Sequence, residues 1–208
     1  MGVPYRNYKI KEYVDRTSSK LEITSAITGV KVEFPAFVTD FSQTFESNWS
    51  QEEVYGRNDP IATFQGTKRT ISISFSLPAG KPAEAAQNLN KCRVLTQFLY
   101  PGYNDSVHKS KGANNKTVTK KLGRVIDRAP LVKIKFANLI QGSHASGAPL
   151  LGWIGSLTWT PAITMGYFTD NSELFPKVID LSLSFNVLHQ HDIGFNSANS
   201  PLSAPFPF

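Results

Sequence analysis

Cysteine is almost absent from this sequence, and that absence limits the ways in which the chain can be stabilised. Cys92 is the only cysteine among the 208 residues, so no internal disulfide can form, which fits a reducing compartment. No apolar run approaches the roughly 20 residues that a membrane-spanning helix needs. The first residues, MGVPYRNYKIKEY, lack the apolar core of a signal peptide. We therefore expect assembly in a cytoplasm, without a membrane.

Charged residues are also scarce, and they are unevenly distributed. They make up 18% of the chain against 40% hydrophobic residues, which excludes a largely disordered protein. Seven basic and two acidic residues lie within residues 105–128, which accounts for five of the six net positive charges. The rest of the chain is nearly neutral. This distribution argues against a general nucleic-acid coat, which would be basic all over.

Motifs that would assign a catalytic reaction are missing. The sequence has no phosphate-binding glycine loop, no dinucleotide fingerprint and no nucleophile elbow. Cys92 falls on the apolar stripe of an expected helix, where a buried packing role is more common than a nucleophilic one. We expect no enzyme activity and no cofactor.

Two groups of residues leave chemical alternatives open. His189 and His191 are two apart on an expected strand end, the start of a metal site if Asp192 or His144 added a ligand. Polar residues at a strand end are the more common situation, so we expect no metal. A second group could act in a cell-wall hydrolase, although a solvated loop is the default for adjacent carboxylates. Its members are Glu46, Glu52, Glu53 and Asp59.

Residues 45–77 organise the chain, because both ends of this stretch read as half-buried strands. Between them lies a polar connection with turn signals at Gly56, at 58–60 and at Gly66. The apolar residues of the two strands are Phe37, Phe41, Phe45 and Trp49 on one parity before the connection, and Ile71, Ile73, Phe75 and Leu77 after it. We expect a strand over 37–49, a structured loop, and an antiparallel strand over 70–77.

The remaining periodicities predict further strands and a single helix. Residues 21–24 and 30–34 form a hairpin around Gly29, and residues 82–99 form a helix that starts at Pro82. Strands follow at 131–139, at 151–159 with Trp153, Leu157 and Trp159 on one parity, and at 178–188. Residues 161–176 are expected to be a loop. The basic insertion 104–124 is either a mobile loop or a β-ribbon that reaches out of the body.

These elements predict a mainly β, antiparallel barrel or sandwich with one packed helix. It forms a single domain over residues 21–195. Residues 1–20 are expected to be an extended arm, with a frayed terminus as the alternative. Residues 196–208, which are rich in proline, form a second arm.

Several segments, in order, carry a resemblance to a known family. They are VYGRNDPIATFQGTKRTISISFSLPA, LTQFLYPGY, PLVKIKFANLI, LLGWIGSLTW and FPKVIDLSLSFNVLHQHDIGF. The series resembles bacteriophage proteins that act at the junction of tail tube and baseplate hub in contractile-type tails. It covers most of residues 37–195. The sequence departs from the commoner pattern in its longer lysine-rich insertion, and it has no peptidoglycan-binding module after the barrel.

The resemblance implies a structural virion protein with a barrel of the tail-tube type. Such proteins form a ring, with a hexamer favoured, that starts polymerisation of the tube and lines its channel. The implied partners are adjacent tail-tube and baseplate hub proteins and the tape measure protein, with DNA only as passing cargo. The matching positions 54–60, 67–77, 100–103 and 151–159 would be scaffold and subunit contacts.

We expect subunit contacts at the exposed aromatic and charged residues of the loop, the insertion and the C-terminal arm. They are Trp49, Tyr55, Arg57, Asp59, Lys109, Lys111, Lys116, Lys120, Lys121, Phe206 and Phe208. For the basic insertion, contact with an acidic surface of a neighbouring subunit is favoured. A solvated loop and binding to nucleic-acid phosphates remain alternatives.

Overall fold

The computed structural model describes residues 20–190, except residues 36, 112–116, 138, 143–147 and 171–172. For residues 106–111, 117–122 and 170 it describes the backbone only. Almost all of the expected N-terminal arm and the whole C-terminal arm lie outside these residues. The same holds for Lys116, Phe206, Phe208, His191, Asp192 and His144.

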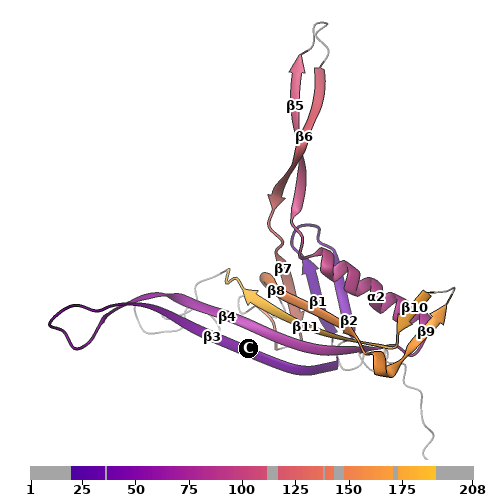
Figure 1. Ribbon diagram of the computed structural model, residues 1–208, viewed down its shortest axis with the longest axis horizontal. Coiled ribbons are helices and arrows are strands. Elements are labelled where there is room, and N and C mark those ends of the chain that lie inside the picture. Colours follow the sequence, from indigo (N-terminus) through magenta and orange to yellow (C-terminus); the bar gives the residue numbers. More distant parts are fainter. Residues whose placement is uncertain are drawn as a thin grey trace, which may run out of the picture.

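The described chain contains eleven strands, one α-helix and one short 3-10 helix (Figure 1). Their bounds are β1 Lys20–Ser25, β2 Lys31–Pro35, β3 Phe37–Glu52, β4 Ile61–Pro78, α2 Pro82–Gln97, β5 Gly102–Lys111, β6 Thr117–Arg128, β7 Val132–Phe136, β8 Leu150–Pro161, η1 Ile163–Met165, β9 Tyr167–Asp170, β10 Glu173–Pro176 and β11 Val178–Val187.

Seven strands form one antiparallel sheet in the order β2-β1-β7-β8-β11-β4-β3, and the other four form two separate ribbons. The sheet folds over on itself. Phe34 of β2 contacts Phe75 of β4 with ring centroids 5.6 Å apart, although four strands lie between β2 and β4 in the order. The prediction of a mainly β, antiparallel fold with one helix is confirmed. The sheet is a sandwich-like layer pair rather than a closed barrel, since β2 and β3 form its two edges within the described residues.

The core lies between the two layers and is built by strict alternation. Ile179, Leu181, Leu183 and Phe185 of β11 are buried, and the residues between them face outward. Ile71, Ile73, Phe75 and Leu77 of β4 alternate in the same way, as predicted. Burying each such side chain contributes about 1.5–3 kcal/mol. These contributions fix the register of β4 and β11, because a slip of one residue would turn every apolar side chain outward.

Helix α2 begins at Pro82, as predicted, and ends two residues before the predicted end. The Gly80 N–H donates to the Glu84 carboxylate at 3.0 Å, which stabilises the first turn. Ala85, Cys92 and Leu95 are buried. The helix packs against β2, β9 and β10.

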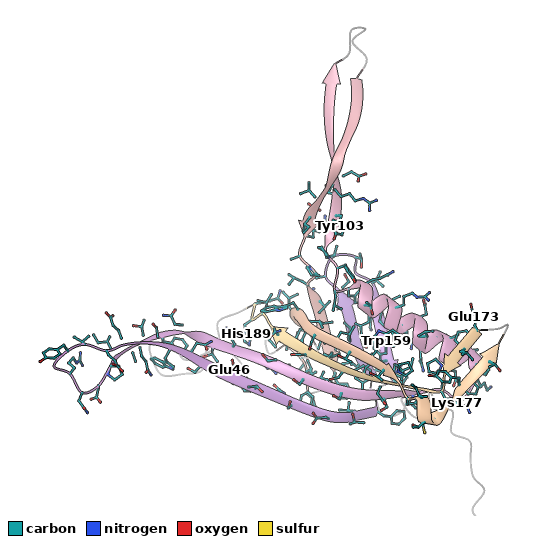
Figure 2. The ribbon with its side chains drawn as sticks, in the orientation of Figure 1. Glu46, Tyr103, Trp159, Glu173, Lys177 and His189 are labelled. Atoms are coloured by element: carbon teal, nitrogen blue, oxygen red, sulfur yellow. The ribbon has the colours of Figure 1, made fainter. Side chains whose placement is uncertain are left out.

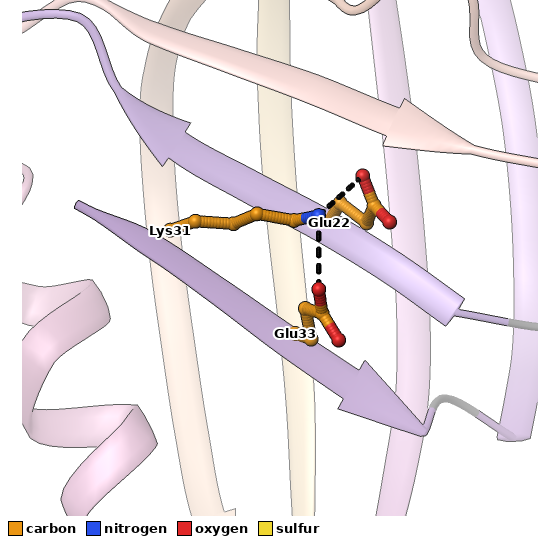
Figure 3. A network of polar contacts seen from close by, with 3 residues as sticks. All are labelled: Glu22, Lys31 and Glu33. Carbon is orange, nitrogen blue, oxygen red and sulfur yellow. Dashed lines mark ion pairs between the residues drawn. The ribbon is translucent and has the colours of Figure 1, made fainter. Parts of the chain in front are cut away.

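The hairpin of β1 and β2 confirms another prediction, and its turn residue Gly29 has φ 72°. Its outer face carries a small charge network (Figure 3). The Lys31 ammonium lies 3.0 Å from the Glu22 carboxylate and 2.9 Å from that of Glu33. Hydrogen bonding to Lys31 lowers the pKa of Glu33, and the two carboxylates raise the pKa of Lys31. The groups are exposed, so the network contributes modestly to stability.

Two predictions about where strands and loops lie are wrong. β4 begins at Ile61 instead of residue 70, so most of the expected loop is strand and the true connection is only residues 53–60. Gly66, with φ 143°, sits at a bulge that interrupts the alternation and hides this part of the strand. Residues 161–176, expected to be a loop, contain η1 and the β9–β10 hairpin.

The side of the sheet on which Phe37 and Trp153 lie was also predicted wrongly, and in both cases a bulge is the reason. A bulge between Val38 and Asp40 turns Phe37 away from the face that carries Phe41. A second irregularity in the β8–β11 register places Trp153 opposite Asn186, whereas Trp159 lies opposite the buried Leu181. Each bulge adds one residue and so reverses which side of the sheet the next residues face.

Candidate assembly surfaces

The outer part of the β3–β4 hairpin projects beyond the core as a two-stranded extension, which we call the arm (residues 45–69). Arg69 is the last buried residue of β4 on the way to the tip. Eight residue steps separate Arg69 from Ile61, or about 25 Å of strand. Figure 1 shows the arm extending along the long axis, away from the rest of the sheet. Such an extension has no layer to cover it within the described part of the chain.

The base of the arm is fixed by Arg69, which is only 2% exposed. Its Nε and Nη2 both donate to the Gln43 Oε1, at 3.1 and 2.6 Å. Its guanidinium carbon lies 5.7 Å from the centroid of the Phe45 ring, a cation–π geometry. Burial lowers the pKa of Arg69 to about 10, so the side chain is still a cation at neutral pH. The contacts connect β3 to β4 at the point where the core ends.

One face of the arm is aromatic. The register places Trp49 directly opposite Phe64, and their rings meet edge to face at 5.2 Å. Phe45 lies on the same side of β3 as Trp49, since four residues separate them. The Trp49 Nε1–H donates to the Ser47 Oγ at 2.9 Å, which satisfies the polar group of the indole. About half of each of these three side chains is exposed. We call Phe45, Trp49 and Phe64 the arm face.

The tip of the arm collects the remaining predicted residues of this region. Tyr55, Arg57 and Asp59 all lie in the connection 53–60 and are exposed, Tyr55 completely. Gly56 adopts φ 85°, and the Arg57 N–H donates to the Val54 carbonyl at 3.1 Å, which closes the turn. The structure therefore brings four of the predicted contact residues onto one projecting element: Trp49, Tyr55, Arg57 and Asp59.

The basic insertion is a second projecting element, which we call the ribbon (β5 and β6). Of the two alternatives, the β-ribbon is correct, and it rises from the body in a different direction from the arm (Figure 1). The register places Lys121 opposite Val107 and Lys120 opposite His108, in the outer half of the ribbon. Lys109 and Lys111 occupy positions further out on β5. The ribbon thus gathers four of the five predicted lysines in its outer half.

The inner half of the ribbon has a different character. Tyr103, at its base in Figure 2, is 57% exposed, and Val125 and Ile126 are 58% and 64% exposed. The only charges beside them are balanced. The Arg124 Nε lies 3.6 Å from the Asp105 carboxylate, and Arg128 lies 3.4 Å from that of Asp127. The ribbon is therefore apolar near the body and basic toward its tip.

The outer face of the main sheet is lined with hydroxyl groups. Cross-strand hydrogen bonds order it: the Ser76 Oγ donates to the Asp180 carboxylate at 2.6 Å, and the Ser74 Oγ donates to the Ser182 Oγ at 3.2 Å. A groove of about 420 Å³ runs over this face. In the middle of this face, the outward residues of the three central strands are Ser72, Ser74 and Ser76 of β4, Asp180, Ser182 and Ser184 of β11, and Ser156, Thr158 and Thr160 of β8. None of these is basic.

The chemical alternatives gain no support from the described residues. Cys92 is buried, and burial raises the pKa of its thiol to about 11, which keeps it protonated, in line with the expected packing role. Glu52 and Glu53 are exposed at the arm tip and do not line the groove. No group of three or more potential metal ligands comes together in the part of the chain that the structure describes.

Sequence reasoning missed Phe64, whose ring packs against Trp49. Phe64 lies in the stretch expected to be a loop, so no partner for Trp49 was foreseen. A usable signal exists, since Trp49 lies seven residues before Gly56 and Phe64 lies seven residues after Arg57. Aromatic residues placed symmetrically around a turn are typical of cross-strand pairs.

Comparisons with known proteins place few constraints on identity. No family model and no curated protein matches the chain. A solved structure with a similar arrangement is the Dit protein (gp 19.1) of SPP1, described as a paradigm of the hub adsorption apparatus in phages that infect Gram-positive bacteria. The match has a TM-score of 0.37 and 10% identity, and it covers 80% of this chain. The chain spans about half (49%) of the length of that protein. Separately, no helix among the described residues is long and apolar enough to cross a membrane.

Proposed function

We propose that this chain is a structural protein of a bacteriophage tail, which assembles with copies of itself into a ring at the junction of baseplate hub and tail tube. Its role is assembly, not catalysis. The ring, a hexamer, starts the tail tube and lines the channel, next to tail-tube, hub and tape measure proteins. The ordered sequence segments that resemble this family support the assignment to a contractile-type tail.

The observation that carries the proposal is the long edge strand of the sheet. β3 contains 16 residues, and β4 is its single neighbouring strand among the described residues, so its other side has no strand beside it in that part of the chain. Proteins usually shield such edges, because a long, exposed edge strand invites pairing with another chain. A strand from the next copy would complete the hydrogen bonding of β3. Repeated around a ring, this pairing gives a continuous wall of sheet.

The hydroxyl face supports the channel role. In its central part, at Ser72–Ser76 of β4, Ser156–Thr160 of β8 and Asp180–Ser184 of β11, the outward side chains are neutral hydroxyls and the Asp180 carboxylate. The basic outward residue of β4, Lys68, lies at the base of the arm opposite Glu46. Binding to a polyanion depends on lysine and arginine that neutralise phosphates. A wall of this composition would let DNA pass without holding it, although the chain as a whole has a net charge of +6.

Two measurements on the purified full chain test the proposal. Sedimentation and electron microscopy should detect a closed ring whose mass is a multiple of 23.0 kDa. Amide hydrogen exchange should then be slowed in β3 by assembly, while β11, which is paired on both sides by β8 and β4, exchanges slowly in both states. A monomer at every concentration would refute the ring. A ring in which β3 exchanges as fast as in the monomer would refute pairing through its edge.

The ribbon supports a second candidate, a nucleic-acid-binding module. Five lysines and no acidic residue lie within residues 106–123. This candidate predicts affinity for DNA that falls steeply with salt and is lost when the lysines are replaced by glutamine. Binding that is weak and independent of these lysines would remove it.

A further inference from the structure

The arm and the ribbon have the same order of surface properties along their length. On the arm, the arm face lies nearer the body, and the tip beyond it carries Glu52, Glu53 and Asp59. Residues 47–67 contain these three acidic residues and a single basic one, Arg57. On the ribbon, the exposed apolar residues again lie nearer the body and the charges lie beyond, but with the opposite sign.

The arm and the ribbon are complementary when they lie side by side with their tips pointing in the same direction. The arm face then contacts Tyr103 and Ile126, which lie opposite each other on one face of the ribbon, and the acidic tip lies beside the lysines of the outer half. The spacing is compatible. Five strand positions, about 17 Å, separate Val125 from Lys120, and about 10–15 Å separate Trp49 from the acidic residues 52 and 53. Alignment in the other direction would place carboxylates beside apolar side chains.

The two elements of one copy cannot meet in this way. They leave the body in different directions, as Figure 1 shows, and each is a paired two-stranded element instead of a loop. At the base of the arm, Arg69 donates to Gln43 and so connects the arm to the body. A match between arm and ribbon therefore requires two copies.

We propose that the arm of one copy docks along the ribbon of a second copy, with the arm face on the apolar inner half and the acidic tip on the basic outer half. The contact is heterologous, because different surfaces of the two copies meet, so it can repeat around a ring. The charges set the direction and speed of docking, and the aromatic side chains hold the contact. The inference rests on the proposed self-assembly and names the surfaces that carry out one of its contacts.

Charge reversal provides the first test. The variant E52K/E53K has a basic arm and a basic ribbon, and K109E/K111E/K120E/K121E, which keeps only Lys116 among the lysines of residues 106–123, has an acidic arm tip and an acidic outer ribbon. Each should self-associate at least about 30-fold more weakly than the unchanged chain at physiological salt. A one-to-one mixture should recover association to within about threefold, because every arm then finds a ribbon of opposite charge. Circular dichroism checks that both variants, altered only on projecting elements, keep the fold.

Oxidative cross-linking tests the alignment independently of affinity. Copies with Trp49→Cys mixed with copies with Ile126→Cys should form a disulfide-linked dimer. A mixture of Trp49→Cys with Val30→Cys, another exposed site, on the β1–β2 turn, should not. The native Cys92 is buried and does not compete.

The outcomes separate this inference from the proposed function. A ring that both charge variants form as well as the unchanged chain would overturn the docking and leave the ring intact. Docked copies without a closed ring would support the docking and refute the ring. If the mixture does not recover association, or if K109E/K111E/K120E/K121E loses only DNA binding, the docking is overturned and nucleic acid becomes the partner of the ribbon.

Discussion

Replacing Phe34 or Phe64 by alanine removes the same atoms from two strands of one sheet, but from very different surroundings. Phe34 is completely buried in β2 and packs on the ring of Phe75. Phe64 lies on the arm, where it is 53% exposed and has its ring contact with Trp49. We expect Phe34→Ala to lower the stability of the monomer strongly, and Phe64→Ala to leave it nearly unchanged while weakening assembly.

The magnitudes follow from burial. Truncation of a buried phenylalanine costs about 3–5 kcal/mol, because the transfer free energy is lost and a cavity remains. For a chain of this size that corresponds to a fall in Tm of roughly 6–20 °C. Phe64→Ala loses an aromatic pair worth about 0.5–1.5 kcal/mol and little buried area. The two variants should therefore differ by at least about 2 kcal/mol in the free energy of unfolding.

Urea unfolding at a concentration that keeps the chain monomeric measures the difference, with circular dichroism as the probe and sedimentation to follow assembly. The reasoning fails if Phe64→Ala costs as much as Phe34→Ala, since the arm would then be part of the cooperative core. It also fails if Phe34→Ala unfolds with a free energy within about 1 kcal/mol of the unchanged chain, because no buried ring in a two-layer core is that dispensable.

Three further predictions concern the body of the protein. Cys92 should not react with a thiol reagent at pH 8 until the chain unfolds, and rapid labelling of the native chain would contradict its burial. Burial raises the pKa of its thiol from 9.0 to about 11. The contribution of Cys92 to stability is therefore complete below pH 9 and is lost as the pH rises through 11. Gly152→Ala should destabilise by about 2–4 kcal/mol in urea, because the new Cβ would lie 2.1 Å from the Asn186 carbonyl oxygen. Gly80→Ala, whose Cβ meets nothing closer than 3.5 Å, is the matched control and should stay within about 0.5 kcal/mol. Lys31→Ala should lower the free energy of unfolding by no more than about 1 kcal/mol. This loss should shrink at high salt, or as the pH falls through the lowered pKa of Glu33. A larger loss that does not depend on salt would count against an exposed ion-pair network.

The elements that could be predicted are those that bury one face completely. In β11 every second residue is buried without interruption, so the sequence pattern and the structure agree nearly to the residue. The same holds for the α2 helix, which starts at Pro82 as expected. Burial of one face imposes a period, and a period is visible in a sequence.

The elements that could not be predicted are stabilised in other ways. The outer half of β4 is exposed on both faces, and β9 and β10 form a short hairpin beside the helix, so neither shows a sustained alternation. Bulges cause the remaining errors, because one extra residue at Thr39 changes the side on which Phe37 lies. The identity of the residue does not reveal such an insertion, because many residue types can occupy a bulge with little loss of stability.

For the candidate surfaces, chemical identity was predictable and arrangement was not. Aromatic and acidic residues around the turn at 56–60, and lysines in the insertion, are evident in the sequence. Strand pairing beyond both turns places the aromatic and acidic residues on the arm and the lysines on the ribbon. The same pairing gives the two elements their matching order of surface properties. Local sequence specifies pairing of this kind weakly, because no core fixes the register there.

The construction of the arm and the ribbon implies an order of events in assembly. A two-stranded ribbon is at best marginally stable in water, because it buries little apolar surface. Both elements extend past the layers that carry the core, so they contribute little to folding of the single chain, and no layer among the described residues covers their exposed aromatic side chains. Folding of the body and the proposed assembly through its extensions are therefore separable steps. The body supplies the stability of the monomer, and the proposed contact with a second copy would supply the second layer that each extension lacks.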